Sequence, residues 1–288
     1  MPFPDSPTAF DTMLGVPSNR SSWQSDFGTL VRDTGSGDLR HPAGYMFHDL
    51  PEVDAESNYG DWLISEMDKW GVERGLLPVR FDDDDLGAAA VAKHPKRLFG
   101  SYHVDPNKGM DDVRALERAV RELGVIAASC FPCGTQPQVP IHGPLMYPLY
   151  AKCVELGIPM FVNAGVPGPR FPMWPQHVEH LDVVCYDFPE LVLVTRHGCE
   201  PWTDLAVKLM LKWPGLHYST SAFAPKHYPK DIIDYANTRG ADKIMYAGYF
   251  PMGLSLERTM TEMRNLPLKD HVWPKFLHEN AARVLKLD

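Results

Sequence analysis

The chain has 288 residues, of which 44% are hydrophobic and 23% charged, and these values are ordinary for a globular protein with a sizeable core. The formal net charge of −9 argues against a nucleic-acid partner. No apolar run approaches the ~18 residues of a membrane span, and no basic N-terminal stretch precedes an apolar one. Five cysteines are an odd number, which favours free thiols over a disulfide framework. We therefore expect a cytoplasmic protein that associates with neither nucleic acid nor membrane.

Eight apolar runs of strand length follow one another along the chain. Several are continuous rather than alternating, as in Leu191–Val194, which is typical of parallel strands buried on both faces. The eight runs are Ala9–Val16, Arg74–Val79, Leu98–Val104, Val125–Phe131, Pro159–Ala164, Leu191–Arg196, Leu216–Ser221 and Lys243–Gly248.

Segments with helical periodicity lie between these runs. In Asp111–Leu123, apolar residues recur at spacings of three and four. Similar patterns predict helices over Leu145–Leu156, Trp202–Trp213, Lys230–Thr238 and Leu256–Leu266. Alternating strands and helices favour either a closed barrel or an open doubly wound sheet, and the pattern alone does not separate the two. A chain of this length suits a single (β/α)8 TIM barrel, for which about 250 residues are typical, so we expect one domain over residues 1–288.

The segment 17–54 interrupts this regular pattern. It is long, weakly periodic and rich in Ser, Gly, Asp and His. A loop of this length in a compact domain is usually a lid, a binding loop or a contact between subunits. Because it follows the first strand directly, a barrel would place it on the catalytic face.

The sequence Leu191–Trp202 contains the strongest local motif. A buried strand ends at His197, Gly198 makes the turn, and Glu200 precedes the next helix. A polar residue where a barrel strand ends lies where substrates bind, although a structural histidine is an equally good interpretation of one such residue. Arg196 is adjacent to His197 and is expected to point away from the lumen, because successive strand residues face opposite sides.

Together with this motif, several segments resemble the amidohydrolase-related family that includes aminocarboxymuconate semialdehyde decarboxylase and the resorcylate-type decarboxylases. The resemblance covers most of the chain and is carried by His94–Gly100, Pro144–Gly165, Arg196–Gly198, Lys243–Pro251 and Glu279–Leu285. It implies a TIM barrel with a divalent metal at the carboxyl ends of the strands, and hydrolase or decarboxylase activity.

The chain departs from the family pattern at most of the metal-binding positions. Met13 and Gly15 stand where the resemblance implies two histidines, Asn163 where it implies a third, and Tyr249 where it implies an aspartate. Only His197 keeps the family identity. Zinc needs three or four N, O or S ligands, and one imidazole among these neighbours does not supply them. We therefore expect no metal cofactor, the alternative being a divalent ion such as zinc held by a rebuilt ligand set.

Other side chains could contribute to such a set or to different chemistry. Further candidate ligands are His103 near the end of strand three and, in loops, His41, His48, Asp49, His177 and His180. Cys130 and Cys133 form a C-x-x-C pair that resembles a redox or metal-binding pair. It follows an apolar strand, and no second pair completes a structural zinc site, so packing or substrate contact is the better interpretation. The run Asp82–Asp85 is best interpreted as the N-cap of a helix.

Without the metal, the barrel mouth still offers catalytic groups. His197 and His103 can act as acid or base near neutral pH, and Tyr249 and Asn163 can donate hydrogen bonds to an oxyanion. Residues predicted to contact substrate are Asp11, Met13, Cys130, Trp174, Glu200 and Phe250.

Three functions are compatible with these residues. The first is a hydrolase or carbon–carbon lyase that acts on a small cyclic or acyl substrate by metal-independent acid/base chemistry. The second is a metal-dependent enzyme with a rebuilt ligand set, and the third is a non-catalytic barrel that binds a small molecule. We favour the first, in a homodimer or higher homo-oligomer.

Overall fold

The structure, a computed structural model, describes residues 3–17, 23, 27–39, 43–47, 53 and 58–287. Eight parallel strands form one sheet whose order follows the chain. The strands are β1 (Ala9–Asp11), β2 (Val72–Val79), β3 (Leu98–His103), β4 (Val125–Cys130), β5 (Met160–Asn163), β6 (Leu193–Arg196), β7 (Leu216–Ser219) and β8 (Ile244–Met245). Each lies in or overlaps one of the eight predicted apolar runs, and the predicted TIM barrel is confirmed.

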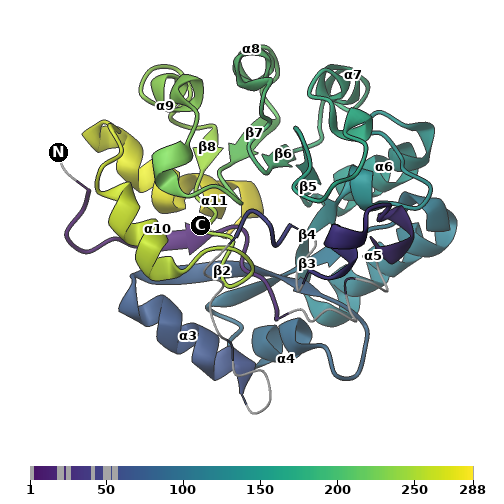
Figure 1. Cartoon of the computed structure of the whole chain (residues 1–288), viewed down its shortest axis with the longest axis horizontal. Helices are drawn as coiled ribbons and strands as arrows, with labels where there is room; N and C mark the ends of the chain where they lie inside the picture. Colours follow the sequence, from purple (N-terminus) through teal and green to yellow (C-terminus); the bar gives the residue numbers. More distant parts are fainter. Residues whose placement is uncertain are drawn as a thin grey trace.

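Helices surround the strands on the outside (Figure 1). The α-helices are α2 (Thr34–Gly37), α3 (Tyr59–Lys69), α4 (Leu86–Lys93), α5 (Met110–Leu123), α6 (Tyr147–Leu156), α7 (His180–Asp187), α8 (Thr203–Lys212), α9 (Lys230–Ala236), α10 (Leu256–Met263) and α11 (Asn280–Leu285). Short 3₁₀ turns are η1 (Gly28–Leu30), η2 (Pro106–Lys108), η3 (Pro132–Gly134), η4 (Pro144–Met146), η5 (Trp174–Gln176), η6 (Pro225–His227) and η7 (Asp270–Val272), and η8 (Lys275–Glu279) is a π-helical turn. Of the described residues, none belongs to a helix long and apolar enough to cross a bilayer.

The barrel closes where β1 meets β8. The backbone N–H of Thr12 donates to the carbonyl of Tyr246 at 3.2 Å, and the Thr12 hydroxyl donates to the same carbonyl at 2.9 Å. Nearer the amino end, Phe276 in η8 accepts a hydrogen bond from the Tyr246 N–H. The regular part of β1 is therefore shorter than its predicted run, because the chain bends after Asp11 to make these closing contacts.

The lumen has an apolar floor. Its side chains come from alternate positions of the strands, as expected for residues that face the same side of a sheet. Helix α11 covers the amino end and completes this cluster, which contains Phe10, Leu76, Ala127, Phe161, Val194, Met245, Ala281, Val284 and Leu285. The floor is packed with side chains, so a ligand can approach only from the carboxyl ends of the strands.

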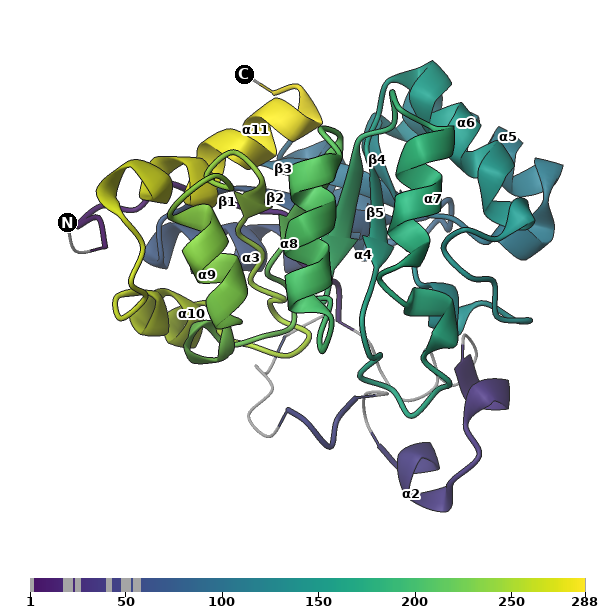
Figure 2. The same ribbon diagram turned by 90° about the horizontal axis from the view of Figure 1, so that it is seen from above.

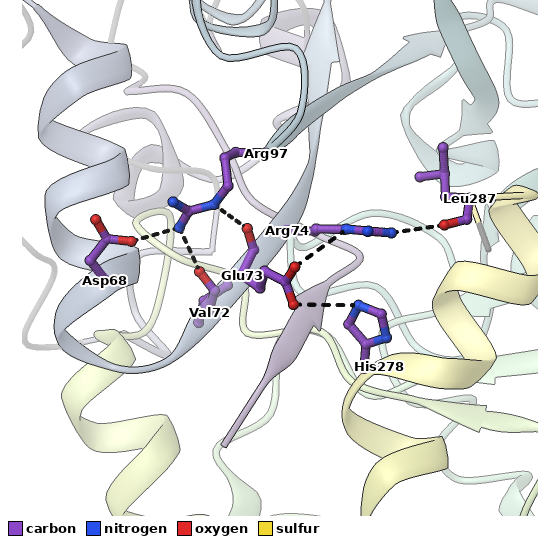
Figure 3. Close-up of polar contacts among 7 residues, drawn as sticks. All are labelled: Asp68, Val72, Glu73, Arg74, Arg97, His278 and Leu287. Atoms are coloured by element: carbon purple, nitrogen blue, oxygen red, sulfur yellow. Dashed lines mark hydrogen bonds and ion pairs between the residues drawn. The ribbon is translucent and has the colours of Figure 1, made fainter. Parts of the chain in front are cut away.

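Polar contacts fix the amino end of β2 to its neighbours (Figure 3). Arg97 donates to Asp68 at 2.6 Å and to the backbone carbonyls of Val72 and Glu73. Arg74 donates to the carbonyl of Leu287 at 2.8 Å and so holds the C-terminal segment. These contacts lie opposite the mouth, where a barrel uses its residues for stability.

Candidate active site

A polar layer lies above the apolar floor. In this layer the hydroxyls of Thr12, which follows β1, and Ser219 on β7 lie 3.3 Å apart. Asn163 lies two residues beyond the floor residue Phe161 and therefore faces the lumen too. Thr12 and Ser219 are fully buried, and Asn163, at 9% exposure, is the most accessible of these three residues.

His197 follows β6 on a left-handed backbone, with φ of 64°. This conformation is rare for a residue with a side chain and costs of order 1–3 kcal/mol, and such residues cluster at functional sites. Ser221 holds the imidazole: its hydroxyl lies 3.2 Å from Nδ1 and accepts the His197 backbone N–H at 3.0 Å. The next residue, Gly198, has φ of 89°, and a Cβ there would lie 2.5 Å from the ring of Phe223. The turn therefore requires glycine after the histidine.

Tyr249 follows β8 in the same unusual conformation, with φ of 58°. Its ring meets the imidazole of His197 edge to face, with the ring centroids 5.3 Å apart. Burial raises the pKa of Tyr249 to about 12, so its hydroxyl stays protonated at neutral pH and can donate a hydrogen bond. The structure thus brings an imidazole and a phenol together at the carboxyl ends of β6 and β8.

Arg196 faces the lumen, so the prediction that it points away is wrong. Its Nη2 donates to the carbonyl of Thr12 at 3.3 Å, on the opposite side of the barrel, and its guanidinium lies 4.7 Å above the ring of Phe161. It shares a face with Val194 in the apolar floor, as alternation along β6 requires. His197 still lies at the mouth because the chain leaves the strand geometry there.

Asp11 is completely buried but lies behind the barrel wall. Phe10 and Thr12 face the lumen, so the residue between them faces outward. Its Oδ1 accepts the backbone N–H groups of Met13 and Gly248, each at 2.9 Å. Burial raises its pKa to about 6, against the lowering effect of these hydrogen bonds. Asp11 therefore connects the ends of β1 and β8 and is not brought to the mouth.

Met252 is packed against Gly15, the second β1 position at which the resemblance implies a histidine. A Cβ on Gly15 would lie 2.4 Å from both Cγ and Sδ of Met252, so the methionine occupies the space that a side chain would need. Met13 is half-buried and lies two residues past the end of β1.

Among the other predicted residues, His103 reaches the mouth. It is exposed at the end of β3, and its Nδ1 lies 3.5 Å from the hydroxyl of Ser129 on β4. Glu200 lies on the turn after His197 and is half-buried; burial raises its pKa, and His227 partly offsets this.

Three predicted substrate contacts are not brought to the lumen. Cys130 lies in the core cluster between barrel and helices, with its Sγ 3.8 Å from Sδ of Met146, and burial raises the pKa of its thiol. Phe250 is likewise buried outside the wall, where its ring stacks on Trp62 at 5.5 Å. Trp174 is 57% exposed on η5.

The remaining candidate ligands do not converge. His180 stacks on His142 at 4.1 Å, and its Nε2 lies 3.0 Å from the carbonyl of Trp174, while His177 packs on Trp202. His41, His48 and Asp49 lie outside the described residues. Within the described ranges, no group of three or more His, Cys, Asp or Glu side chains is arranged to hold a metal. The predicted N-cap is confirmed, because Asp85 accepts the Ala88 N–H at 2.6 Å.

Part of the segment 17–54 lies over the mouth. Figure 2 shows the described residues around α2 beyond the carboxyl ends of the strands, with α11 at the opposite end. Phe27 contacts the rings of Phe131 and Phe171 at 5.6 and 6.2 Å, and Phe47 contacts Tyr249 at 5.6 Å. This segment therefore adds aromatic rings to the surroundings of the site.

The fold and the strand-end residues define a parallel barrel with a polar mouth. The sequence model described as Amidohydrolase matches residues 66–287, and the chain belongs to this family. Membership in this family supports an enzymatic activity of the amidohydrolase type. No match was found among curated proteins.

Solved structures show the same fold at low sequence identity. An uncharacterised TIM-barrel protein from Bordetella bronchiseptica is 23% identical, with a TM-score of 0.77, over 97% of this chain and 99% of that one. The 2,6-dihydroxybenzoate decarboxylase from Rhizobium is 16% identical, with a TM-score of 0.67, over 98% and 99%. The 5-carboxyvanillate decarboxylase from Novosphingobium aromaticivorans, described in complex with manganese, is 17% identical, with a TM-score of 0.69, over 98% and 96%.

Proposed function

We propose that this chain is a hydrolase or carbon–carbon lyase that acts on a small cyclic or acyl substrate by acid/base chemistry without a divalent metal. The observation that carries the proposal is the contact of His197 with Tyr249 at the carboxyl ends of two barrel strands, both on left-handed backbone. Strained residues with side chains are retained where the surrounding structure holds them for function.

Each polar group at the mouth has a role in this chemistry. His197 transfers the proton, since an imidazole titrates near neutral pH and Ser221 holds its Nδ1 side. Tyr249 donates a neutral hydrogen bond to an oxygen that gains negative charge in the transition state. Asn163 supplies a second neutral donor, and His103 a second titratable group on the opposite side.

The residues present do not fit the manganese that one decarboxylase neighbour is described as binding. The family's ligand positions hold a thioether, a glycine, an amide and a phenol, which are poor ligands for a divalent ion. In addition, the guanidinium of Arg196 lies in the lumen, and burial lowers its pKa only to about 10, so it remains a cation that repels a second one.

Aromatic rings around the mouth support a ring-bearing substrate. Phe131 and Phe171 pack 6.3 Å apart, and Phe27 and Phe47 approach from the 17–54 segment. We propose that this segment acts as a lid, because the rings that it contributes lie over the site and would exclude water during the reaction.

We also propose a cytoplasmic homodimer or larger homo-oligomer. All five cysteines are free and buried, as suits a reducing compartment. The rim exposes apolar side chains that a second subunit could cover, among them Tyr45, Met46, Val166 and Trp174.

Turnover of hydroxybenzoates and small lactones by single variants tests the proposal. His197→Ala should reduce the rate by roughly 10²–10⁴-fold, the usual contribution of a general acid or base. Tyr249→Phe keeps the ring and should cost up to about 10²–10³-fold.

The matched controls are His94→Ala and Tyr147→Phe, which remove the same groups outside the mouth, where these residues bond to Asp61 and Asp187. Full activity in both mouth variants would refute the assigned roles. Binding of substrates without turnover would instead favour a non-catalytic binding barrel.

A further inference from the structure

Arg196 is a buried cation whose hydrogen-bonding groups are largely unused. The residue is only 8% exposed. Among the described residues, its one hydrogen bond, from Nη2 to the Thr12 carbonyl, is long at 3.3 Å, and its Nε has no partner there. Guanidinium groups carry five N–H donors, and a buried one normally has most of them satisfied.

No carboxylate in the described part of the chain forms an ion pair with Arg196. Asp11 attracts it electrostatically from behind the wall, but the hydrogen bonds of that carboxylate go to Met13 and Gly248. Around the guanidinium, the polar layer of the lumen carries neutral groups, including the hydroxyls of Thr12 and Ser219. An uncompensated buried charge costs several kcal/mol, and an anionic ligand that pairs with Arg196 would offset this cost.

The surroundings orient the guanidinium for a planar anion. The ring of Phe161 lies beneath it at 4.7 Å, which fixes its plane by stacking and cation–π attraction. Asn163 pairs with Arg196 in the register of β5 and β6, and both residues face the lumen. An amide donor therefore stands beside the guanidinium fork, whose geometry matches a carboxylate.

We infer that Arg196 and Asn163 form an anion subsite that binds a carboxylate group of the ligand, oriented toward the floor of the barrel. The ring or acyl body of the ligand then lies between this subsite and the aromatic rim, beside His197 and Tyr249. This assignment rests on the proposed function in placing the ligand at the same mouth, and it narrows the substrate class to small carboxylic acids.

Binding of matched charged and neutral probes tests the subsite without turnover. Calorimetry compares benzoate with benzamide, and acetate with acetamide, on the full chain. Since a hydrogen bond to a charged group contributes about 1.5–3 kcal/mol, wild-type protein should bind at least one carboxylate about 10- to 100-fold more tightly than its amide.

Three variants determine whether Arg196 carries this preference. Arg196→Met removes the charge and should abolish the preference for the carboxylate over its amide. Arg196→Lys should retain part of that preference, because an ammonium keeps the charge without the fork. Arg258→Met, which removes an exposed arginine paired with Glu262 on α10, should behave as wild type.

Loss of preference in Arg196→Met alone supports the subsite. An unchanged preference in that variant, or no preference for any carboxylate in wild-type protein, overturns it. If Arg196→Met does not fold, Arg196→Lys provides the test, because it loses the planar fork and keeps the charge. The subsite requires that the carboxylate preference of Arg196→Lys be smaller than that of wild type. His197→Ala should keep the carboxylate preference, so a failed catalytic role and a failed subsite give different results.

Discussion

His217 lies inside the barrel wall on β7, and replacing it tests how the lumen responds to acid. It is 4% exposed, its Nδ1 has no hydrogen-bond partner within the described residues, and the charged groups found to lower its pKa there are Lys243 and Arg283. Burial, reinforced by these two cations, lowers its pKa from 6.5 to about 3. His217→Gln keeps a polar side chain of similar length that does not titrate.

The magnitude follows from the two pKa values. Between pH 6.5 and about 3 the unfolded chain is protonated at this histidine and the folded chain is not. Stability from this group is therefore complete above pH 6.5 and is lost as pH falls toward 3. At about 1.36 kcal/mol per pH unit, the loss over that interval is of order 5 kcal/mol.

Urea denaturation of wild-type protein and His217→Gln at intervals from pH 7.5 to 4.0 measures this contribution. As the pH falls, wild type should lose several kcal/mol more of its free energy of unfolding than the variant does. The raised pKa of Asp11 gives both proteins the opposite slope between its ordinary 3.8 and about 6, so it cancels in the difference.

His271→Gln, at an exposed histidine on η7, is the control and should show no such trend. A pH-independent difference between wild type and His217→Gln would refute the argument that His217 is buried in its neutral form.

Two further changes test the packing around the site. Gly248→Ala should destabilise the fold by about 1–3 kcal/mol in denaturation experiments, because its Cβ would lie 2.5 Å from both Asp11 Oδ2 and the Tyr246 hydroxyl. Gly37→Ala is the control, because a Cβ at Gly37 would meet no described atom within 4 Å beyond its chain neighbours. Equal stability of the two variants would contradict the close approach at Gly248. A thiol reagent should label none of the five buried cysteines in native protein and all of them after unfolding, since burial raises their pKa values; rapid labelling of Cys130 and Cys133 would reopen a redox role.

The positions of the strands were predictable because burial on both faces leaves a strong pattern. Runs such as Leu191–Val194 have no polar face, so they indicate parallel strands between two apolar layers. The helix at Met110–Leu123 was predictable from its apolar stripe, and it ends at Gly124 in the left-handed conformation that glycine favours.

The facing of side chains at the strand ends was less predictable. Alternation placed Arg196 and His197 on opposite sides, but it could not show that His197 adopts φ of 64° and leaves the strand geometry. A similar change of path after β8 separates Phe250, which lies behind the wall, from Tyr249 at the mouth. Left-handed backbone at residues other than glycine leaves no local sequence signal, because tertiary contacts impose it.

The inward orientation of Arg196 was predictable from the sequence. Val194 lies in an apolar run and Arg196 two residues later, so an inward-facing valine implies an inward-facing arginine. The prediction instead took His197 as the inward-facing residue, and alternation along the strand then placed Arg196 on the outside. The contacts of Trp174, His142 and His180 on the rim depend on loop packing and could not be inferred from spacing.

The metal content of active protein tests the account most directly. Protein purified without chelator and without an affinity tag is analysed for zinc, manganese and iron, and its turnover is measured before and after dialysis against a chelator. Metal-independent chemistry requires clearly less than one equivalent of metal per chain and an unchanged rate. One equivalent of a divalent ion that is lost in His197→Ala, with activity lost on chelation and restored by the ion, would show that the ligand set has been rebuilt and that the account is wrong.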